Sequence, residues 1–395
     1  MSRRAWRWYA MAKKKIFITA GEVSGDVNAS HLVRAVKDID PDIEFAGIGG
    51  RHLREAGVRL LADSSTWGSI GFLEGVVKGF VILPVARRLA AMFEQEKPDL
   101  YVPVDYRFFS MRGARIAKSR GIPVVYYFSP VSWFGSGGKR FEELAATIDL
   151  SLVALPLSLD QYREAGVNFQ YIGHPLVDAV KPSMTREEAL RFFGLEGDGP
   201  VIGFMPGSRG QEIKRLMPVF ARAARIIQKE SVGARFIAFR AIEQYDFLIK
   251  KCIGDAPVSV AHEKVYDFMN VCDVLALCSG TATHEAAILG KPMVVCYKIN
   301  PVTGWIVRKT VNPPMIGLPN IIGREFVVPE LVQEACTPES VADETVKLLK
   351  EEDIRTKTIE KLGIVRDRLG KPGVLERAAK LVVEAVHGDL SIEED

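Results

Sequence analysis

The 395-residue chain lacks several features that would point to a particular class of protein. Its five cysteines are odd in number, lie in the second half and include no CxxC pair, which argues against a disulfide framework or a zinc site. Lys and Arg number 52 against 49 Asp and Glu, so bulk electrostatic binding of nucleic acid is not expected. No uncharged apolar run reaches the roughly 18 residues of a membrane-spanning helix. We therefore expect a folded, cytosolic protein.

Histidine patterns that would hold a metal are also missing. The six histidines form neither an HExxH motif nor another paired ligand spacing, so we expect no catalytic metal and no cofactor. His174, within Gly-His-Pro, is the one histidine that we place near a functional site, with a purely structural histidine as the alternative.

Residues 1–13 form a basic, aromatic opening without the apolar core and cleavage site of a signal peptide. We expect a tail before the first strand, either a disordered extension or an amphipathic contact with a membrane surface. Met1 and Met11 are both possible starts of translation.

Apolar runs of strand length alternate with helical patterns through both halves of the chain. Strands without polar alternation are typical of parallel sheets that helices cover on both faces. The predicted strands are 16–20, 45–47, 100–104, 124–128 and 150–155, then 201–205, 235–239, 258–261, 274–277 and 293–297. The pattern predicts an α/β protein with two doubly wound, Rossmann-like domains, which we place at 14–178 and 179–370. Residues 371–395 are expected to form a C-terminal helix and tail, and ligands are expected in a cleft between the two sheets.

The segment 67–88 carries more apolar residues than one core-facing stripe needs, and it ends in two arginines. It is either a well-buried helix or a surface that receives acyl chains or a bilayer. The candidate lipid or membrane contacts are Ile70, Phe72, Phe80, Ile82, Leu83, Arg87 and Arg88.

Two loops of the first half present carboxylates after strands. The loop 21–26 is not a GxGxxG fingerprint, and Glu22 and Asp26 would oppose a phosphate, so a hydroxyl-rich, sugar-like ligand suits it better. Alternatively, Asp26 lies in the first turn of a helix that Ser24 caps. Asp105 follows a central strand, where a general base would be placed, although a helix N-cap is the alternative. Trp133 belongs to an aromatic loop that we also expect at the cleft.

The second half contains two loops suited to an anion and a sugar. Residues 206–213 combine Gly207, which allows close backbone approach, with Arg209, whose guanidinium suits a diphosphate. Residues 278–285 open a helix with small and hydroxyl residues and place Glu285 one turn in. A glutamate at this position can accept both hydroxyls of a ribose.

Seven motifs occur in order along the chain: GEVSGD at 21–26, Asp105 after KPDLYVPV, YFSPVSW at 127–133, IGHP at 172–175, PGSRGQEI at 206–213, SGTATHEA at 279–286 and LPNIIGRE at 318–325. Together they resemble the lipid-A-disaccharide synthase family, which consists of GT-B glycosyltransferases, and the resemblance covers most of the chain.

The resemblance implies an activity and its site residues. It implies metal-independent, inverting transfer from UDP-2,3-diacylglucosamine to 2,3-diacylglucosamine 1-phosphate, giving a β-1,6-linked disaccharide and UDP, by an enzyme peripheral to the inner face of the cytoplasmic membrane. It assigns the base to Asp105; if Asp105 only caps a helix, Glu22 and Asp26 in the first loop are the further catalytic candidates. The implied UDP contacts are Gly207, Ser208, Arg209, Ser279, Gly280, Thr281, Glu285 and Asn320.

The sequence departs from the family pattern after Trp133, where a Trp and an Arg are lost, and after Asp105, where a second Asp is lost. Both changes fall on the acceptor side. The alternatives are therefore another GT-B enzyme with a UDP-N-acetylglucosamine-type donor, such as a 2-epimerase, or a weakly active, membrane-associated paralogue.

Overall fold

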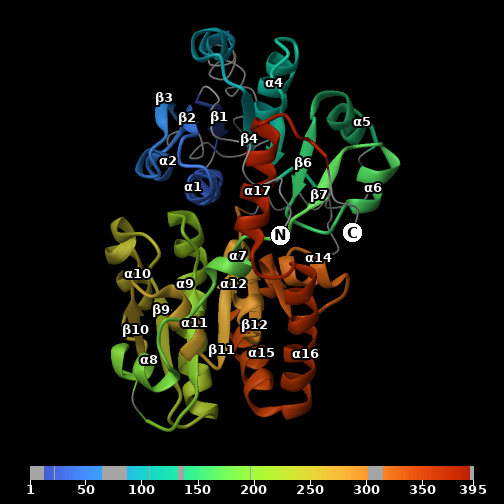
Figure 1. Ribbon diagram of the computed structural model, residues 1–395. Helices are drawn as coiled ribbons and strands as arrows, with labels where there is room; N and C mark the ends of the chain where they lie inside the picture. Colours follow the sequence, from blue (N-terminus) through green and yellow to red (C-terminus); the bar gives the residue numbers. More distant parts are fainter. Residues whose placement is uncertain are drawn as a thin grey trace. The chain divides into compact units, whose positions relative to one another are not determined.

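The computed structural model describes residues 13–21, 23–64, 87–105, 107–131, 138–195, 197–300 and 315–391. The chain divides into two compact units (Figure 1). Unit 1 comprises Met1–Pro175 and Gly370–Asp395, and unit 2 comprises Leu176–Leu369. Each unit contains one sheet with helices packed around it, which confirms the predicted α/β class.

The sheet of unit 1 has the strand order β3-β2-β1-β4-β5-β6-β7, and every pairing among its described strands is parallel. The central strands β1 and β4 are almost wholly buried because helices cover both of their faces. The strands are β1 (Lys15–Ala20), β2 (Glu44–Gly49), β3 (Arg59–Asp63), β4 (Leu100–Val104), β5 (Val125–Tyr127), β6 (Leu150–Val153) and β7 (Phe169–Tyr171). The labelled helices are α1 (Val23–Ile39), α2 (Arg51–Glu55), α4 (Arg107–Lys118), α5 (Gly138–Thr147), α6 (Leu159–Glu164) and α17 (Val374–Val386), and residues 87–96 are helical as well.

The sheet of unit 2 has the order β10-β9-β8-β11-β12-β13 and is also parallel across its described strands. The strands are β8 (Val201–Met205), β9 (Arg235–Phe239), β10 (Val258–Ala261), β11 (Val274–Cys278), β12 (Met293–Tyr297) and β13 (Glu330–Val332). The helices are α7 (Leu176–Ala179), α8 (Arg186–Phe192), α9 (Gly210–Glu230), α10 (Asp246–Ile253), α11 (Val265–Val271), α12 (Thr281–Ile288), α14 (Leu318–Gly323), α15 (Pro338–Lys350) and α16 (Glu352–Arg368), with 3₁₀ turns at Glu243–Tyr245 and Gln333–Ala335.

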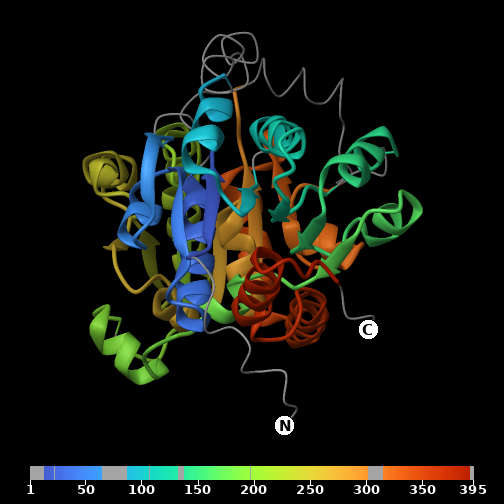
Figure 2. The same cartoon turned by 45° about the horizontal axis from the view of Figure 1, so that its top comes forward.

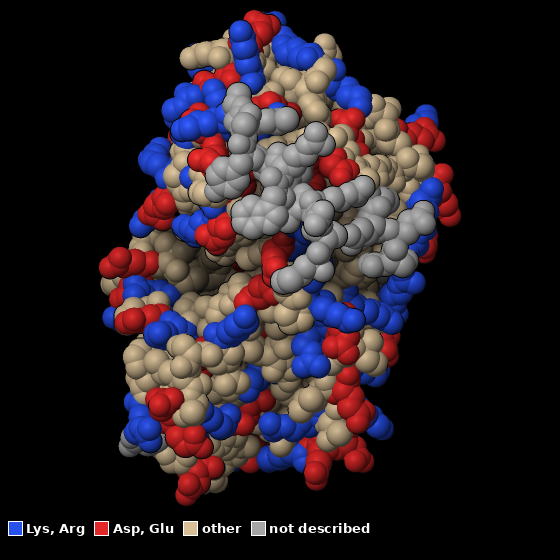
Figure 3. Space-filling model, in the orientation of Figure 1, with Lys and Arg blue, Asp and Glu red and all other residues tan. Residues whose placement is uncertain are grey.

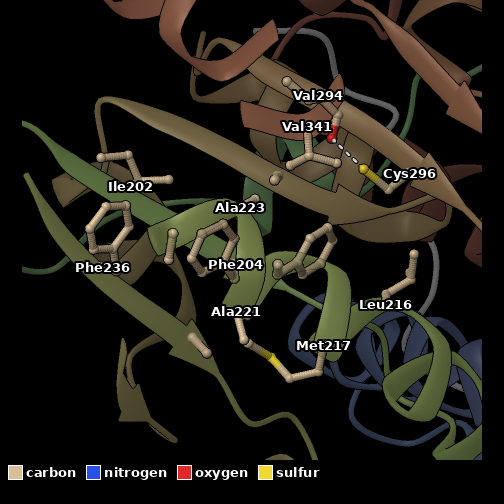
Figure 4. Close-up of a cluster of buried hydrophobic side chains, with 14 of the residues drawn as sticks. Ile202, Phe204, Leu216, Met217, Ala221, Ala223, Phe236, Val294, Cys296 and Val341 are labelled. Carbon is tan, nitrogen blue, oxygen red and sulfur yellow. Dashed lines mark hydrogen bonds between the residues drawn. The ribbon is translucent and has the colours of Figure 1, made fainter. Parts of the chain in front are cut away.

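Aromatic stacking fixes α9 against the sheet of unit 2 (Figure 4). The ring of Phe204 on β8 stacks on Phe220 of α9, with centroids 5.3 Å apart, and on Phe236 of β9 at 6.1 Å. Leu216 and Met217 of α9 are buried in the same cluster. This packing holds the N-terminus of α9 at the carboxyl end of β8.

Helix α17 belongs to unit 1 although unit 2 separates it from the rest of that unit in sequence. It lies beside α1 in both ribbon views (Figures 1 and 2). The His387 ring nitrogen Nε2 lies 3.1 Å from Asp40 Oδ2, and Asn168 Nδ2 donates to Leu390 O at 3.2 Å. Residues 371–395, expected as a separate C-terminal helix and tail, are a part of unit 1. None of the described helices is long and apolar enough to cross a membrane.

Candidate functional site

A cavity of about 290 Å³ opens in unit 2 at the carboxyl ends of β8, β9 and β11. The strand ends form the floor of the cavity. The first turn of α9 and the first turn of α12 form its two polar walls. Its lining residues are Met205, Gly207, Ser208, Arg209, Glu212, Phe239, Ala241, Val265, Cys278, Ser279, Gly280, Thr281, Ala282 and Glu285. The structure thus brings together all the residues that the sequence predicts to contact UDP, except Asn320.

The first wall of the cavity is the turn from β8 into α9. Gly207 has φ +105°, which a residue with a side chain rarely adopts, and a Cβ built on it would lie 2.3 Å from Glu212 Oε2. The Arg209 side chain is 80% exposed, and its Nη1 donates to Glu212 Oε1 at 2.8 Å. This hydrogen bond raises the pKa of Arg209, so the cation is permanent. The backbone N–H groups of this helix start favour an anion.

The second wall is the turn from β11 into α12. Ser279 Oγ donates to Ile316 O at 2.9 Å, and Thr283 Oγ1 donates to Gly280 O at 2.7 Å, which fixes the loop. Glu285 lies one turn into the helix, and burial raises its pKa to about 7. A carboxyl group with this pKa can accept hydrogen bonds from hydroxyl groups near neutral pH. Together the two walls suit a ligand that carries both phosphate and hydroxyl groups.

Asn320 does not line the cavity. Its side chain is fully buried, with Nδ2 donating to Val328 O and Glu330 Oε1 and Oδ1 accepting from the backbone N–H groups of Val327 and Val328. The hydrogen-bonding capacity of the amide is therefore used within unit 2. Asn320 thus supports the loop that receives Ser279, because its partner Glu330 also accepts the N–H groups of Ile316 and Gly317. A direct contact of Asn320 with UDP stays a prediction.

Unit 1 positions Asp105 at the carboxyl end of β4. Its φ of +49° lies in the left-handed region, which stores strain in a non-glycine residue. Two hydroxyl groups hold this backbone, because Asp105 O accepts from Ser110 Oγ at 2.6 Å and from Tyr126 Oη at 2.9 Å. The Asp105 side chain is half-buried and adjoins the first loop, since a Cβ built on Gly25 would lie 3.8 Å from Asp105 Cβ.

Asp26 has a structural role, whereas a catalytic role for it stays a prediction. Its Oδ1 accepts from the N–H of Gly50 at 2.6 Å, and its Oδ2 accepts from the N–H of His52 at 2.9 Å. The buried carboxylate thus satisfies the free N–H groups at the start of α2. Ser24 lies inside α1, which begins at Val23, and so does not cap it.

Arg87, Arg88 and His174 are the remaining predicted residues that the structure describes. Arg87 and Arg88 are exposed on a helical segment of unit 1. His174 is buried edge-on to Phe128, with ring centroids 5.4 Å apart, and burial lowers its pKa to about 4, so it is neutral at physiological pH. The predictions for Glu22, Ile70, Phe72, Phe80, Ile82, Leu83 and Trp133 fall outside the described residues. Over the described ranges, no group of three or more His, Cys, Asp or Glu side chains could hold a metal ion.

Comparison with known proteins identifies the family. A family model described as lipid-A-disaccharide synthetase matches residues 16–381. The chain belongs to the lipid-A-disaccharide synthase family. The synthase of Geobacter metallireducens is 39% identical over 94% of this chain and 97% of its own length. The synthase of Coxiella burnetii (strain Dugway 5J108-111) is 32% identical over 94% of this chain and 98% of its own. Membership makes the protein a glycosyltransferase of lipid A disaccharide formation.

Solved structures show the same fold at low identity. A UDP co-structure of MnaA from S. aureus has a TM-score of 0.65, 14% identity and coverage of 97% of this chain and 99% of that one. The glycotransferase of kitacinnamycin has a TM-score of 0.64 at 16% identity, covering 94% and 98%. A UDP-N-acetylglucosamine 2-epimerase from Listeria monocytogenes has a TM-score of 0.64, 14% identity and coverage of 98% and 99%. The 2-epimerase alternative is not favoured, because this likeness is one of fold alone.

Three residues that hold these loops through backbone contacts were not predicted from the sequence. Glu212 lay inside a recognised motif but received no role, and Ser110 and Tyr126 gave no signal. Glu212 is three residues after Arg209, a spacing typical of a glutamate that folds back on a helix start. That spacing is a signal that could have found it.

Asn320→Ala should lower the free energy of unfolding by about 2 to 4 kcal/mol, because four buried hydrogen bonds are lost and their partners stay buried. Urea unfolding measures the change. Asn168→Ala, which removes two hydrogen bonds of a partly buried amide in unit 1, is the control and should cost less. A variant with unchanged stability but much weaker UDP binding would instead make Asn320 a direct ligand.

Proposed function

We propose that this synthase transfers 2,3-diacylglucosamine from its UDP conjugate to 2,3-diacylglucosamine 1-phosphate, forming a β-1,6 bond and releasing UDP with inversion and without a metal ion. The observation that carries the proposal is the cavity of unit 2, which is lined by a helix start suited to phosphate, by the cation of Arg209 and by the carboxyl group of Glu285. Family membership supports the lipid A disaccharide as the product.

The donor is proposed to bind with its diphosphate at the start of α9. The N–H groups of Ser208 and Arg209 and the Arg209 guanidinium would stabilise the negative charge that grows on the leaving diphosphate. Gly207 leaves room for the approach of phosphate oxygens. Ser279, Gly280 and Thr281 are proposed to contact the nucleotide from the second wall, and Glu285 to accept the ribose hydroxyl groups.

Unit 1 supplies the proposed base, Asp105. An inverting transfer needs a group that accepts the proton of the attacking hydroxyl, and a half-buried carboxylate on a rigid strand end suits this task. The hydroxyl groups of Ser110 and Tyr126 bind the backbone of Asp105. They therefore hold the strand end that carries the carboxylate.

Purified protein incubated with both proposed substrates should yield disaccharide and UDP, detected by mass spectrometry. Asp105→Asn should lower turnover by roughly 100- to 10,000-fold with little change in UDP affinity, because the amide cannot take the proton. Asp160→Asn, which changes an exposed carboxylate of the same unit, is the control. Near-normal turnover of the Asp105→Asn variant would reject the base, and UDP or sugar products without disaccharide would reject the proposed reaction.

UDP affinity should rise with pH and level off above about pH 7, because the deprotonated form of Glu285 accepts the ribose hydroxyl groups. Its raised pKa leaves the carboxyl group largely protonated at pH 6, where binding must release a proton. The terminal phosphate of UDP ionises near pH 6 as well, at about the value typical of phosphate esters. Glu285→Gln therefore serves as the reference, and calorimetry at several pH values should show a steeper dependence for the unaltered protein. Identical pH profiles would remove Glu285 from the nucleotide site.

We also propose that the synthase associates peripherally with the inner face of the cytoplasmic membrane. The apolar sequence of 67–86 precedes two exposed arginines, Arg87 and Arg88, an arrangement that suits anionic headgroups. Elsewhere, acidic and basic side chains are interspersed over the visible face (Figure 3), so the attraction must be local.

Replacing Arg87 and Arg88 by glutamate should weaken binding to anionic phospholipid vesicles by about 30-fold or more at low salt, since each surface cation contributes about 1 kcal/mol. Sedimentation with vesicles measures the partition. The same change at Arg222 and Lys229, which are exposed on α9, is the matched control and should have little effect. Equal losses in both variants would indicate a general charge effect.

A further inference from the structure

The phosphate-binding turn of unit 2 already holds an anion of its own, the carboxylate of Glu212. Glu212 Oε2 accepts the backbone N–H of Ser208 at 3.2 Å and that of Arg209 at 3.1 Å. Glu212 Oε1 accepts from the Arg209 guanidinium at 2.8 Å. These are the same donors that the proposed function assigns to the diphosphate.

The turn is shaped around this carboxylate. A Cβ on Gly207 would lie 2.3 Å from Glu212 Oε2 and 2.9 Å from Glu212 Cβ, so only glycine leaves space for the glutamate to fold back. The Glu212 side chain is 16% exposed, whereas Arg209 is 80% exposed. The carboxylate is therefore seated in the turn, while the guanidinium remains accessible to a ligand.

Two anions cannot share these donors. A phosphate oxygen on the N–H groups of Ser208 and Arg209 would meet Glu212 Oε2 at close range, where like charges repel strongly. Binding of a diphosphate at this turn thus requires the carboxylate to leave. Uridine, which has no phosphate, would not compete with it.

We propose that Glu212 is an internal competitor for phosphate and sets the specificity of the site for a diphosphate. In the free protein the carboxylate accepts the N–H groups at the start of α9. A ligand therefore binds only if its own hydrogen bonds to these donors are more favourable than those that Glu212 loses. A diphosphate does so because it offers several oxygens to the same N–H groups and to Arg209. This inference rests on the proposed UDP site.

The test is Glu212→Gln, measured by calorimetric titration with UDP and with uridine. The amide oxygen can still accept the backbone N–H groups, so α9 keeps a cap while the competing charge is removed. UDP affinity should rise about 10-fold, the low end of the range for a charge-assisted hydrogen bond, and uridine affinity should stay the same. Unchanged or weaker UDP binding overturns the proposal.

Glu188→Gln is the matched control in the same unit. Glu188 folds back on the start of α8 in the same way, accepting the N–H of Thr185 at 2.8 Å, and it does not line the cavity. The UDP affinity of the Glu188→Gln variant should equal that of the unaltered protein. An equal rise of UDP affinity in both variants would overturn a local role for Glu212.

A structure of the UDP complex provides a second test that needs no variant. The proposal expects a phosphate oxygen on the N–H groups of Ser208 and Arg209, with the Glu212 carboxylate moved off them. A complex in which Glu212 keeps these hydrogen bonds overturns it. Failure of UDP to bind any form of the protein overturns this inference together with the proposed function, whereas normal binding with no effect of Glu212→Gln overturns the inference alone.

Discussion

The parallel pairing of β8 with β11 is the constraint on which the site of unit 2 depends. Leu277 pairs with Met205, so both strands end at the same level and the turns that follow them open side by side. Each turn starts a helix, and the first N–H groups of a helix have no partner within it. Two such helix starts at one sheet edge create a local preference for anions in a protein whose overall charge is nearly balanced.

Buried polar groups explain why some motif residues are structural. Asp26 and Asn320 belong to motifs that are similar to those of the family. The side-chain polar atoms of both residues form hydrogen bonds with nearby backbone groups. Leaving those backbone groups unsatisfied in the interior would be costly, so a polar side chain beside them is required for folding alone. Asp105 differs because hydroxyl groups hold its backbone while its side chain remains half-buried. A motif therefore marks a region of the site more securely than it marks each contact.

The sequence predicts the central strands and the loops after them, because strands that are buried on both faces have continuous apolar sequences. It does not reveal β3, β7 and β13, whose residues are mostly half-buried and lack such a run. The packing of α17 on α1 was equally hidden, since an amphipathic helix does not specify its distant partner. In the site, Gly207, Arg209 and Glu285 could be predicted from residue type and position. Glu212 could have been found from its spacing after Arg209, which is typical of a glutamate that folds back on a helix start. Ser110 and Tyr126 could not, because only the fold brings their hydroxyl groups to the backbone oxygen of Asp105.

The return of α17 to unit 1 has a consequence for synthesis on the ribosome. Unit 2 is one continuous stretch of chain and has all of its strands and helices before α17 is made. The face of α1 that α17 covers therefore stays without this helix until the whole of unit 2 has been translated. During that interval the nascent chain carries an uncovered apolar surface, which is the kind of surface that chaperones bind and that promotes aggregation. The order of the chain thus makes unit 2 the first part able to mature and unit 1 the part that most depends on protection.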